Sequence, residues 1–232
     1  MWWFIIPWQI LCCFLITPLW AQTRKQIDHY FPSFQKTSPG RQQYIVKNVA
    51  KSGVLMFLSP PALWIINRIV FYNTWEQALI KCMGALYSSG DIISLVYMFD
   101  KIPITTKVHH ICVLGFSVMN AVSIDYLNST SIWRNTAVLA AFSAPTYAVN
   151  TYLGVRCLDG ISDREKRRLA DFALSLYTFF MSLSFGWQIF ALYSQSSWTW
   201  DVYVYIVALG CIYYDDFHLS TYLWDNSNCR RS

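Results

Sequence analysis

Charged residues are scarce in this sequence. Asp, Glu, Lys and Arg together make up 13% of the 232 residues, whereas 55% of the residues are hydrophobic. Soluble globular domains carry about 25% charged residues. The composition therefore argues against an ordinary soluble domain and favours a membrane protein.

Several common signatures are also missing. The chain contains no Gly-rich phosphate loop, no internal repeat and no low-complexity tract. Its seven cysteines are scattered and odd in number, so they provide no disulfide framework. No His-x-x-x-His or similar helical spacing is present, so a His/Asp metal site that would recruit His218 and Asp216 ranks last among the possible sites. We expect no bound metal or other cofactor. Basic loops that contact anionic lipid headgroups explain the net charge of +5 without a nucleic-acid partner.

Long apolar runs recur along the chain, and seven of them are long enough to cross the roughly 30 Å hydrocarbon layer of a bilayer. They are residues 2–21, 52–71, 77–99, 104–124, 132–153, 170–193 and 202–224. The predicted fold class is therefore an all-α polytopic membrane protein with about seven transmembrane helices.

The first apolar segment is set apart from the others. Residues 24–41 combine charges with Pro, Ser and Gly, which is typical of a linker. We therefore expect an N-terminal transmembrane helix that acts as a signal anchor (1–23), a cytosolic linker (24–41), a six-helix transmembrane domain (42–224) and a cytosolic tail (225–232). The alternative for residues 1–21 is a cleaved signal peptide, but no basic residue precedes their apolar stretch.

The basic residues are distributed unevenly over the connections. Of the 18 Lys and Arg residues, 15 fall on one side of the expected membrane, and only Arg68, Lys81 and Arg134 fall on the other. The positive-inside rule makes the first side cytosolic, which places the N-terminus in the lumen or outside and the C-terminus in the cytosol. In the loop before the sixth segment, residues 162–165 (Ser-Asp-Arg-Glu) are typical of a helix start.

Two adjacent histidines, His109 and His110, lie just inside the fourth segment, and Asp91 lies inside the third. A charged group within a membrane-spanning helix costs about 2.5–3.5 kcal/mol on insertion scales, so such groups usually face the bundle interior and mark a functional site. Imidazoles can transfer protons or act as nucleophiles near neutral pH. Because the third and fourth segments are joined by a short connection, we expect antiparallel neighbours whose polar groups meet in a cavity open to the cytosol. These three residues are the predicted catalytic residues.

Further polar side chains belong to the same cytosolic half. Asn150 lies near the cytosolic end of the fifth segment, and Asp215, Asp216 and His218 lie toward that end of the seventh. A bundle with a polar cytosolic half and an apolar lumenal half suits an amphiphile whose head lies among the polar groups. We expect Asn150 and Asp216 to bind the substrate. An alternative interpretation of Asp215 and Asp216 is that they only mark the boundary between membrane and water.

Three stretches of the chain resemble the TLC-domain family, which includes the ceramide synthases. Residues 84–93 (GALYSSGDII) place an Asp-hydrophobic pair shortly after an aromatic residue, residues 107–112 (KVHHIC) contain the paired histidine, and residues 143–150 (SAPTYAVN) are similar to a Ser-Thr-Pro…Asn segment of smaller members. The resemblance covers about residues 42–224. It is closer to the compact TLC-domain proteins than to the synthases, because the acidic residues that follow the histidine pair in synthases are absent here.

The resemblance implies a six-helix barrel around a narrow cavity, preceded here by one extra helix, in the endoplasmic reticulum membrane, with a role in lipid metabolism or lipid homeostasis. One implied activity is acyl transfer from acyl-CoA, as a cytosolic co-substrate, to an amine or alcohol on a lipid. One histidine would then contact the acyl carbonyl, the other would relay the proton, and Asp91 would fix a tautomer. Arg167 and the basic loop around it would attract the CoA phosphates. The alternative is a non-catalytic protein that binds a membrane lipid or fatty acyl chain, regulates membrane composition or escorts cargo.

Overall fold

The computed structural model describes residues 2–228, and no residue in that range lies in a β-strand. The helices are α1 (Trp2–Tyr30), α2 (Pro39–Tyr72), α3 (Gln77–Met98), α4 (Ile104–Val122), α5 (Thr136–Ser143), α6 (Tyr147–Val155), α7 (Asp163–Tyr193) and α8 (Trp200–Asn228). Short 3-10 turns, among them η4 (Ala144–Thr146), lie between them. The all-α prediction is therefore confirmed for the described residues.

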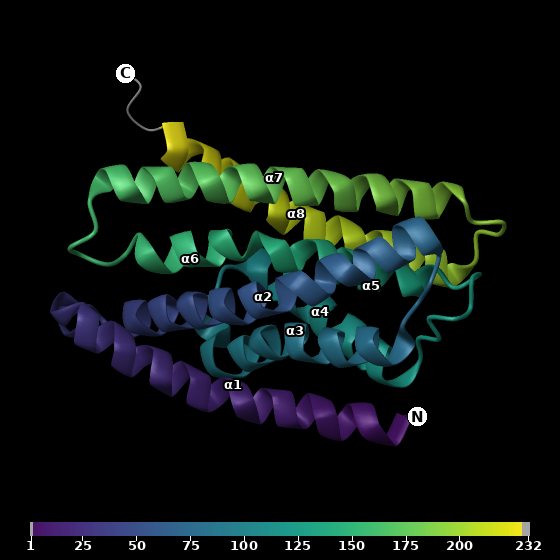
Figure 1. The fold of residues 1–232 in the computed structure, drawn as a ribbon, viewed down its shortest axis with the longest axis horizontal. Coiled ribbons are helices and arrows are strands. Elements are labelled where there is room, and N and C mark those ends of the chain that lie inside the picture. The colour runs from purple at the N-terminus through teal and green to yellow at the C-terminus, as the bar shows by residue number, and fades with distance from the viewer. Residues whose placement is uncertain (1, 229–232) are drawn as a thin grey trace.

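The helices lie side by side along the longest axis of the molecule, with the N-terminus at one end and α8 ending toward the other (Figure 1). The most extensive packing is between α2 and α6, α1 and α3, α3 and α4, and α7 and α8. The prediction that the third and fourth apolar segments are neighbours is thus confirmed. Large apolar side chains such as Phe14, Phe71 and Phe179 remain exposed on the outside of the bundle, as expected where lipid replaces water.

Four helices within the described residues are long and apolar enough to cross a membrane. They are Phe4–Tyr30, Pro39–Tyr72, Gln77–Lys101 and Asp163–Tyr193. The other three predicted spans coincide with helical segments, namely α4, residues 136–155 and α8. Lys107 and the histidine pair lower the hydropathy of α4, and acidic residues lower that of α8. A membrane crossing by these three segments, and hence the total of seven, stays a prediction.

The fifth apolar segment forms two helices because of Pro145. Proline has no backbone N–H to donate and so interrupts α-helical hydrogen bonding. The chain adopts a 3-10 turn at Ala144–Thr146 and continues directly into α6. The side chains of two neighbouring residues bond to backbone carbonyls at this break, Ser143 Oγ to Leu139 at 2.9 Å and Thr146 Oγ1 to Ser143 at 2.7 Å. Helices α5 and α6 therefore follow each other with only this 3-10 turn between them.

Helix α1 differs from the expected isolated anchor. It continues to Tyr30, so residues 24–30 of the expected linker are helical, and only a short connection with one 3-10 turn precedes α2. The Gln9 side chain of α1 docks this helix onto its neighbours. Its Nε2 donates to Ala85 O and Ser89 Oγ of α3, both at 2.9 Å, and its Oε1 accepts from Ser117 Oγ of α4 at 2.8 Å. Helix α1 is thus packed into the bundle rather than set apart from it.

At the other end of the chain, α8 continues to Asn228, beyond the expected end of the seventh span at residue 224. The first four residues of the expected cytosolic tail (225–232) are therefore helical. Its last four residues, which include Arg230 and Arg231, lie outside the described residues.

Candidate functional site

A cavity of about 450 Å³ lies inside the bundle, and helices α2 to α8 contribute to its walls. Its lining on α2 extends from Tyr44 to Ile65. At about 1.5 Å rise per residue, a separation of 21 residues along the helix corresponds to a length of roughly 30 Å. The cavity is therefore long and narrow, and it follows the helix axes.

The two ends of this cavity differ in polarity. The end nearer the last described turn of α8 is lined by ionisable and amide side chains: Lys47, Lys51, His109, His110, Asn150, Asp215, Asp216 and His218. The opposite end is lined mainly by apolar side chains: Leu58, Ala62, Ile65, Ile80, Met83, Val113, Phe116 and Ala137. Ser117 and Asn120 also line the apolar half, but both are hydrogen bonded to neighbouring residues. We call these two regions the polar end and the apolar end.

Tyr126, in the loop between α4 and η3 (Ile132–Asn135), lines the apolar end. Its hydroxyl donates to Asn120 Oδ1 at 2.7 Å, and its backbone N–H donates to Gln77 Oε1 at 3.0 Å. Burial raises the pKa of the Tyr126 phenol above its ordinary value, so the phenol stays neutral at physiological pH. An uncharged, hydrogen-bonded ring thus covers this end of the cavity.

Asp91 forms the centre of an ionic cluster beside the polar end. Lys51 Nζ lies 2.5 Å from Asp91 Oδ1, and His110 Nδ1 lies 3.2 Å from the same oxygen. On the far side of its ring, His110 Nε2 lies 3.4 Å from Lys47 Nζ. Asp91 is fully buried behind these groups and does not line the cavity. The carboxylate is therefore the counter-ion of Lys51 and lies within ion-pair distance of His110, but it does not form part of the cavity wall.

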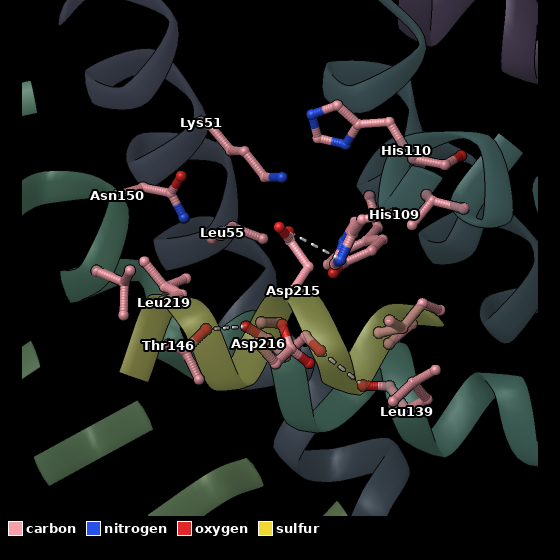
Figure 2. A pocket seen from close by; sticks show the side chains of 18 of the residues that line it. Lys51, Leu55, His109, His110, Leu139, Thr146, Asn150, Asp215, Asp216 and Leu219 are labelled. Carbon is pink, nitrogen blue, oxygen red and sulfur yellow. Dashed lines mark hydrogen bonds and ion pairs between the residues drawn. The ribbon is translucent and has the colours of Figure 1, made fainter. Parts of the chain in front are cut away.

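His109 has a different partner. Its Nδ1 lies 3.5 Å from Asp215 Oδ2 of α8, and Thr106 Oγ1 donates to Asp215 Oδ1 at 3.2 Å. Figure 2 shows His109 and Asp215 facing each other while Lys51, His110 and Asn150 point toward the same space. Because Asp215 approaches Nδ1, Nε2 is the nitrogen of His109 left for a ligand. This histidine and its carboxylate are thus the pair best placed for chemistry in the cavity.

The structure distributes the predicted residues over two layers. His109, His110, Asn150 and Asp216 line the cavity, whereas Asp91 lies behind it. Asp216 Oδ1 accepts a hydrogen bond from the Tyr177 hydroxyl at 2.7 Å, which holds the carboxylate in the cavity wall. Arg167 does not reach this cavity and lines a separate outer pocket.

Sequence reasoning missed Lys47 and Lys51. The apolar run begins only at residue 52, so the sequence predicts that both lysines belong to a cytosolic connection. Helix α2 begins at Pro39 instead, so both lysines lie within it. Their spacing of four residues places them on one helical face, and this spacing was the signal available in the sequence.

Ligand atoms of Asp91, His109 and His110 lie within 4.8 Å of one another, an arrangement that could hold a metal ion. However, Lys51 Nζ already lies against the Asp91 oxygen that faces this group. A divalent ion would have to displace a buried ammonium group from its counter-ion. The donor set therefore fits a metal poorly while Lys51 is in place.

Comparisons of the chain with protein-family models, curated proteins and solved structures found no match in any of the three.

Proposed function

We propose that this protein binds an acyl lipid in its bundle, with the lipid head at the polar end of the cavity and the acyl chain in the apolar end. The observation that carries this proposal is the change of polarity along one continuous cavity. Burial of an acyl chain contributes about 0.8 kcal/mol per methylene group, so a long apolar end favours long chains. Ligand pockets commonly combine a mostly apolar wall with a few polar groups that fix orientation, as here.

The reaction that this arrangement supports best is acyl transfer from acyl-CoA to an amine or alcohol on a lipid. His109 Nε2 takes the proton from the acceptor as the acceptor's nitrogen or oxygen attacks the thioester carbonyl. The C–S bond then breaks, and the departing thiolate receives that proton, so an amide or ester and a free thiol are formed. Asp215 stabilises the imidazolium formed on the way, since its carboxylate lies beside Nδ1. The other catalytic residue in this proposal, His110, lines the cavity beside Lys47, and its Nε2 turns from Lys47 to the acyl carbonyl when acyl-CoA binds.

The remaining predicted residues take supporting roles in this proposal. Asn150 and Asp216 bind the polar head of the acceptor, since both line the polar end. Asp91 acts as a positioning residue for His110 and Lys51 rather than as a partner of the reacting histidine. Arg167 attracts the phosphates of acyl-CoA from its place in the outer pocket. Membership in the TLC-domain family and a location in the endoplasmic reticulum stay proposals of the same kind.

A second candidate function is non-catalytic lipid binding, which would regulate membrane composition or escort cargo. The observation that favours it is the pairing of Lys51 with Asp91. A carboxylate that already neutralises a lysine contributes less to stabilising an imidazolium on His110. A lipid-binding protein would need the cavity and its polar end, but no reactive histidine.

The experiment that separates these functions is acyl transfer by the purified protein in detergent, with acyl-CoA and a panel of amine- and hydroxyl-bearing lipids. We expect turnover with wild type and loss of turnover in His109→Ala, with folded protein retained in both. Turnover that survives in His109→Ala contradicts the proposed mechanism. Absence of turnover with every acceptor, together with acyl lipid that copurifies with the protein, supports the second candidate.

A further inference from the structure

A second pocket of about 720 Å³ lies at the end of the bundle where the α6–α7 loop and the end of α8 meet. We call it the outer pocket. Three of its lining residues, Tyr44, Arg156 and Tyr222, also line the inner cavity. These three side chains therefore form the wall between the two spaces.

The outer pocket is strongly basic. Its charged lining residues are Arg41, Arg156, Lys166, Arg167 and Asp163. Within residues 2–228, no carboxylate forms an ion pair with any of the four cations. The N-terminus of α7 beside them is already capped, because Ser162 and Glu165 form a capping box. The unbalanced positive charge therefore comes from side chains of α2, of α7 and of Arg156, the residue that follows α6.

Arg156 is held in the dividing wall by aromatic rings rather than by an acid. Its guanidinium lies 4.6 Å from the centre of the Tyr222 ring, and one of its terminal nitrogens donates to the Tyr44 hydroxyl at 3.2 Å. Its Nε is buried and has no hydrogen-bond partner among the described residues. A guanidinium with an unused donor and no counter-ion favours a ligand with anionic oxygens, which it can bind through two parallel hydrogen bonds.

We propose that the outer pocket binds a phosphate-bearing ligand and that Arg156 is the gate residue between this pocket and the inner cavity. The phosphate oxygens draw the guanidinium toward Lys166 and Arg167 and away from Tyr44 and Tyr222. Because these three side chains form the dividing wall, this movement opens a route into the polar end. The gate deepens the proposed function, since it controls access to the acyl-lipid cavity, whereas phosphate binding does not depend on that function. Either a soluble phosphate compound or a phospholipid headgroup can supply the phosphate oxygens that this pocket binds.

The phosphate site is tested by titrating the full chain, purified in detergent, with pyrophosphate and with coenzyme A. We expect both to bind wild type and Arg167→Gln to weaken binding roughly tenfold, as expected for loss of a charge-assisted hydrogen bond. Arg168→Gln is the matched control, because Arg168 is exposed, belongs to the same segment and lines neither pocket. The proposal of a soluble phosphate ligand is overturned if neither probe binds wild type. It is also overturned if Arg167→Gln and Arg168→Gln weaken binding equally.

A second arm tests the lipid source, using nanodiscs that contain phosphatidylglycerol or only phosphatidylcholine. Enrichment of phosphatidylglycerol around wild type but not around Arg167→Gln assigns the site to a headgroup. If phosphatidylglycerol is not enriched and neither pyrophosphate nor coenzyme A binds, the phosphate site is overturned altogether.

The gate is tested by the rate at which the protein takes up a fluorescent fatty acid. We expect pyrophosphate to accelerate uptake severalfold in wild type, and Arg156→Gln to take up the fatty acid rapidly without it. If Arg156→Gln does not fold, Tyr222→Leu tests the same contact by removing the ring. This variant should also take up the fatty acid rapidly without pyrophosphate. Uptake that is insensitive to pyrophosphate and to both variants overturns the gate. Pyrophosphate binding with no uptake in any variant contradicts the proposed function and the gate but leaves the phosphate site.

Discussion

Lys51 of α2 places its Nζ 2.5 Å from Oδ1 of Asp91 on α3, and the carboxylate has no exposed surface. This ion pair joins two helices beside the polar end of the cavity, so Asp91 lies against Lys51 as well as His110 and not against the histidines alone. His109, one of the two histidines that line the cavity, is paired with Asp215. The histidine and carboxylate that we propose for the reaction are thus contributed by α4 and α8, whereas Asp91 lies behind the cavity wall.

Lys51→Met should destabilise the protein more than a surface lysine substitution does. Removing one partner of a buried ion pair costs about 3–5 kcal/mol, because the other charge is left buried without a counter-ion. Here His110 lies 3.2 Å from Asp91 and should recover part of that cost. The measurement is the apparent unfolding temperature in detergent, with the exposed Lys36→Met as control. The double variant Lys51→Met/Asp91→Leu should regain most of the loss, and a double variant less stable than the single one would contradict this account.

Gln9→Ala should loosen α1 from the bundle. The substitution leaves Ser117, which is buried, without the acceptor that it uses in the wild-type protein. Interhelical hydrogen bonds in membranes contribute about 0.6 kcal/mol on average and up to about 1.7 kcal/mol, and Gln9 makes several. We expect a lower unfolding temperature and faster proteolysis between α1 and α2. Gln22→Ala, at an exposed position on the same helix, should have no effect. Equal behaviour of both variants would show that α1 is not docked through Gln9.

Gly154→Ala should destabilise the contact between α2 and α6. A Cβ at this position would lie 2.7 Å from Val49 Cγ2 and 3.3 Å from the backbone oxygen of Ile45, and the backbone cannot rotate away as a side chain can. Overpacking of this kind costs typically about 1–3 kcal/mol. Thermal unfolding should show the loss, and Val49→Ala in the same chain should restore part of it. Gly186→Ala meets nothing within 4 Å and is the control expected to be neutral or slightly stabilising.

Asp215→Asn should reduce acyl transfer at least about 100-fold if His109 acts as the general base, because the amide cannot stabilise the imidazolium. His110→Ala should also lower turnover, and it should in addition lower stability because His110 belongs to the Lys51–Asp91 cluster. Asp225→Asn is the control on the same helix, at an exposed position that lines neither pocket. The readout is the initial rate of amide or ester formation. A rate in Asp215→Asn equal to that of the control would remove Asp215 from the mechanism.

Much of the fold could be predicted from the sequence, since apolar runs set apart by polar connections already mark the helical segments. The meeting of Asp91 with His109 and His110 was also predicted, because a short connection forces the two helices to pack together. Hydropathy could not show where a helix continues past its apolar run. For that reason Lys47 and Lys51 were placed in a connection, although α2 includes them.

The docking of α1 and the choice of carboxylate partners could not be read from the sequence. Gln9 is one polar residue in an apolar run. Its hydrogen bonds, which dock α1, depend on the positions of Ser88, Ser89 and Ser117 on other helices. Likewise, Asp215 and Asp216 are adjacent in sequence but face different partners, His109 and Tyr177. Such pairings follow from the tertiary packing of helices that are distant in the chain.

The central claim is that an acyl lipid lies in the cavity in one orientation, and photo-crosslinking tests it most directly. Two fatty acids, one with a diazirine near the carboxyl group and one with a diazirine near the methyl end, are bound to the purified protein, and the labelled residues are mapped by mass spectrometry. We expect the first probe to label the neighbourhood of His109 and Asp215 and the second to label that of Ile65 and Ile80, with competition by unlabelled fatty acid. Labelling by both probes only at outward-facing residues such as Phe71, without competition, would contradict the account.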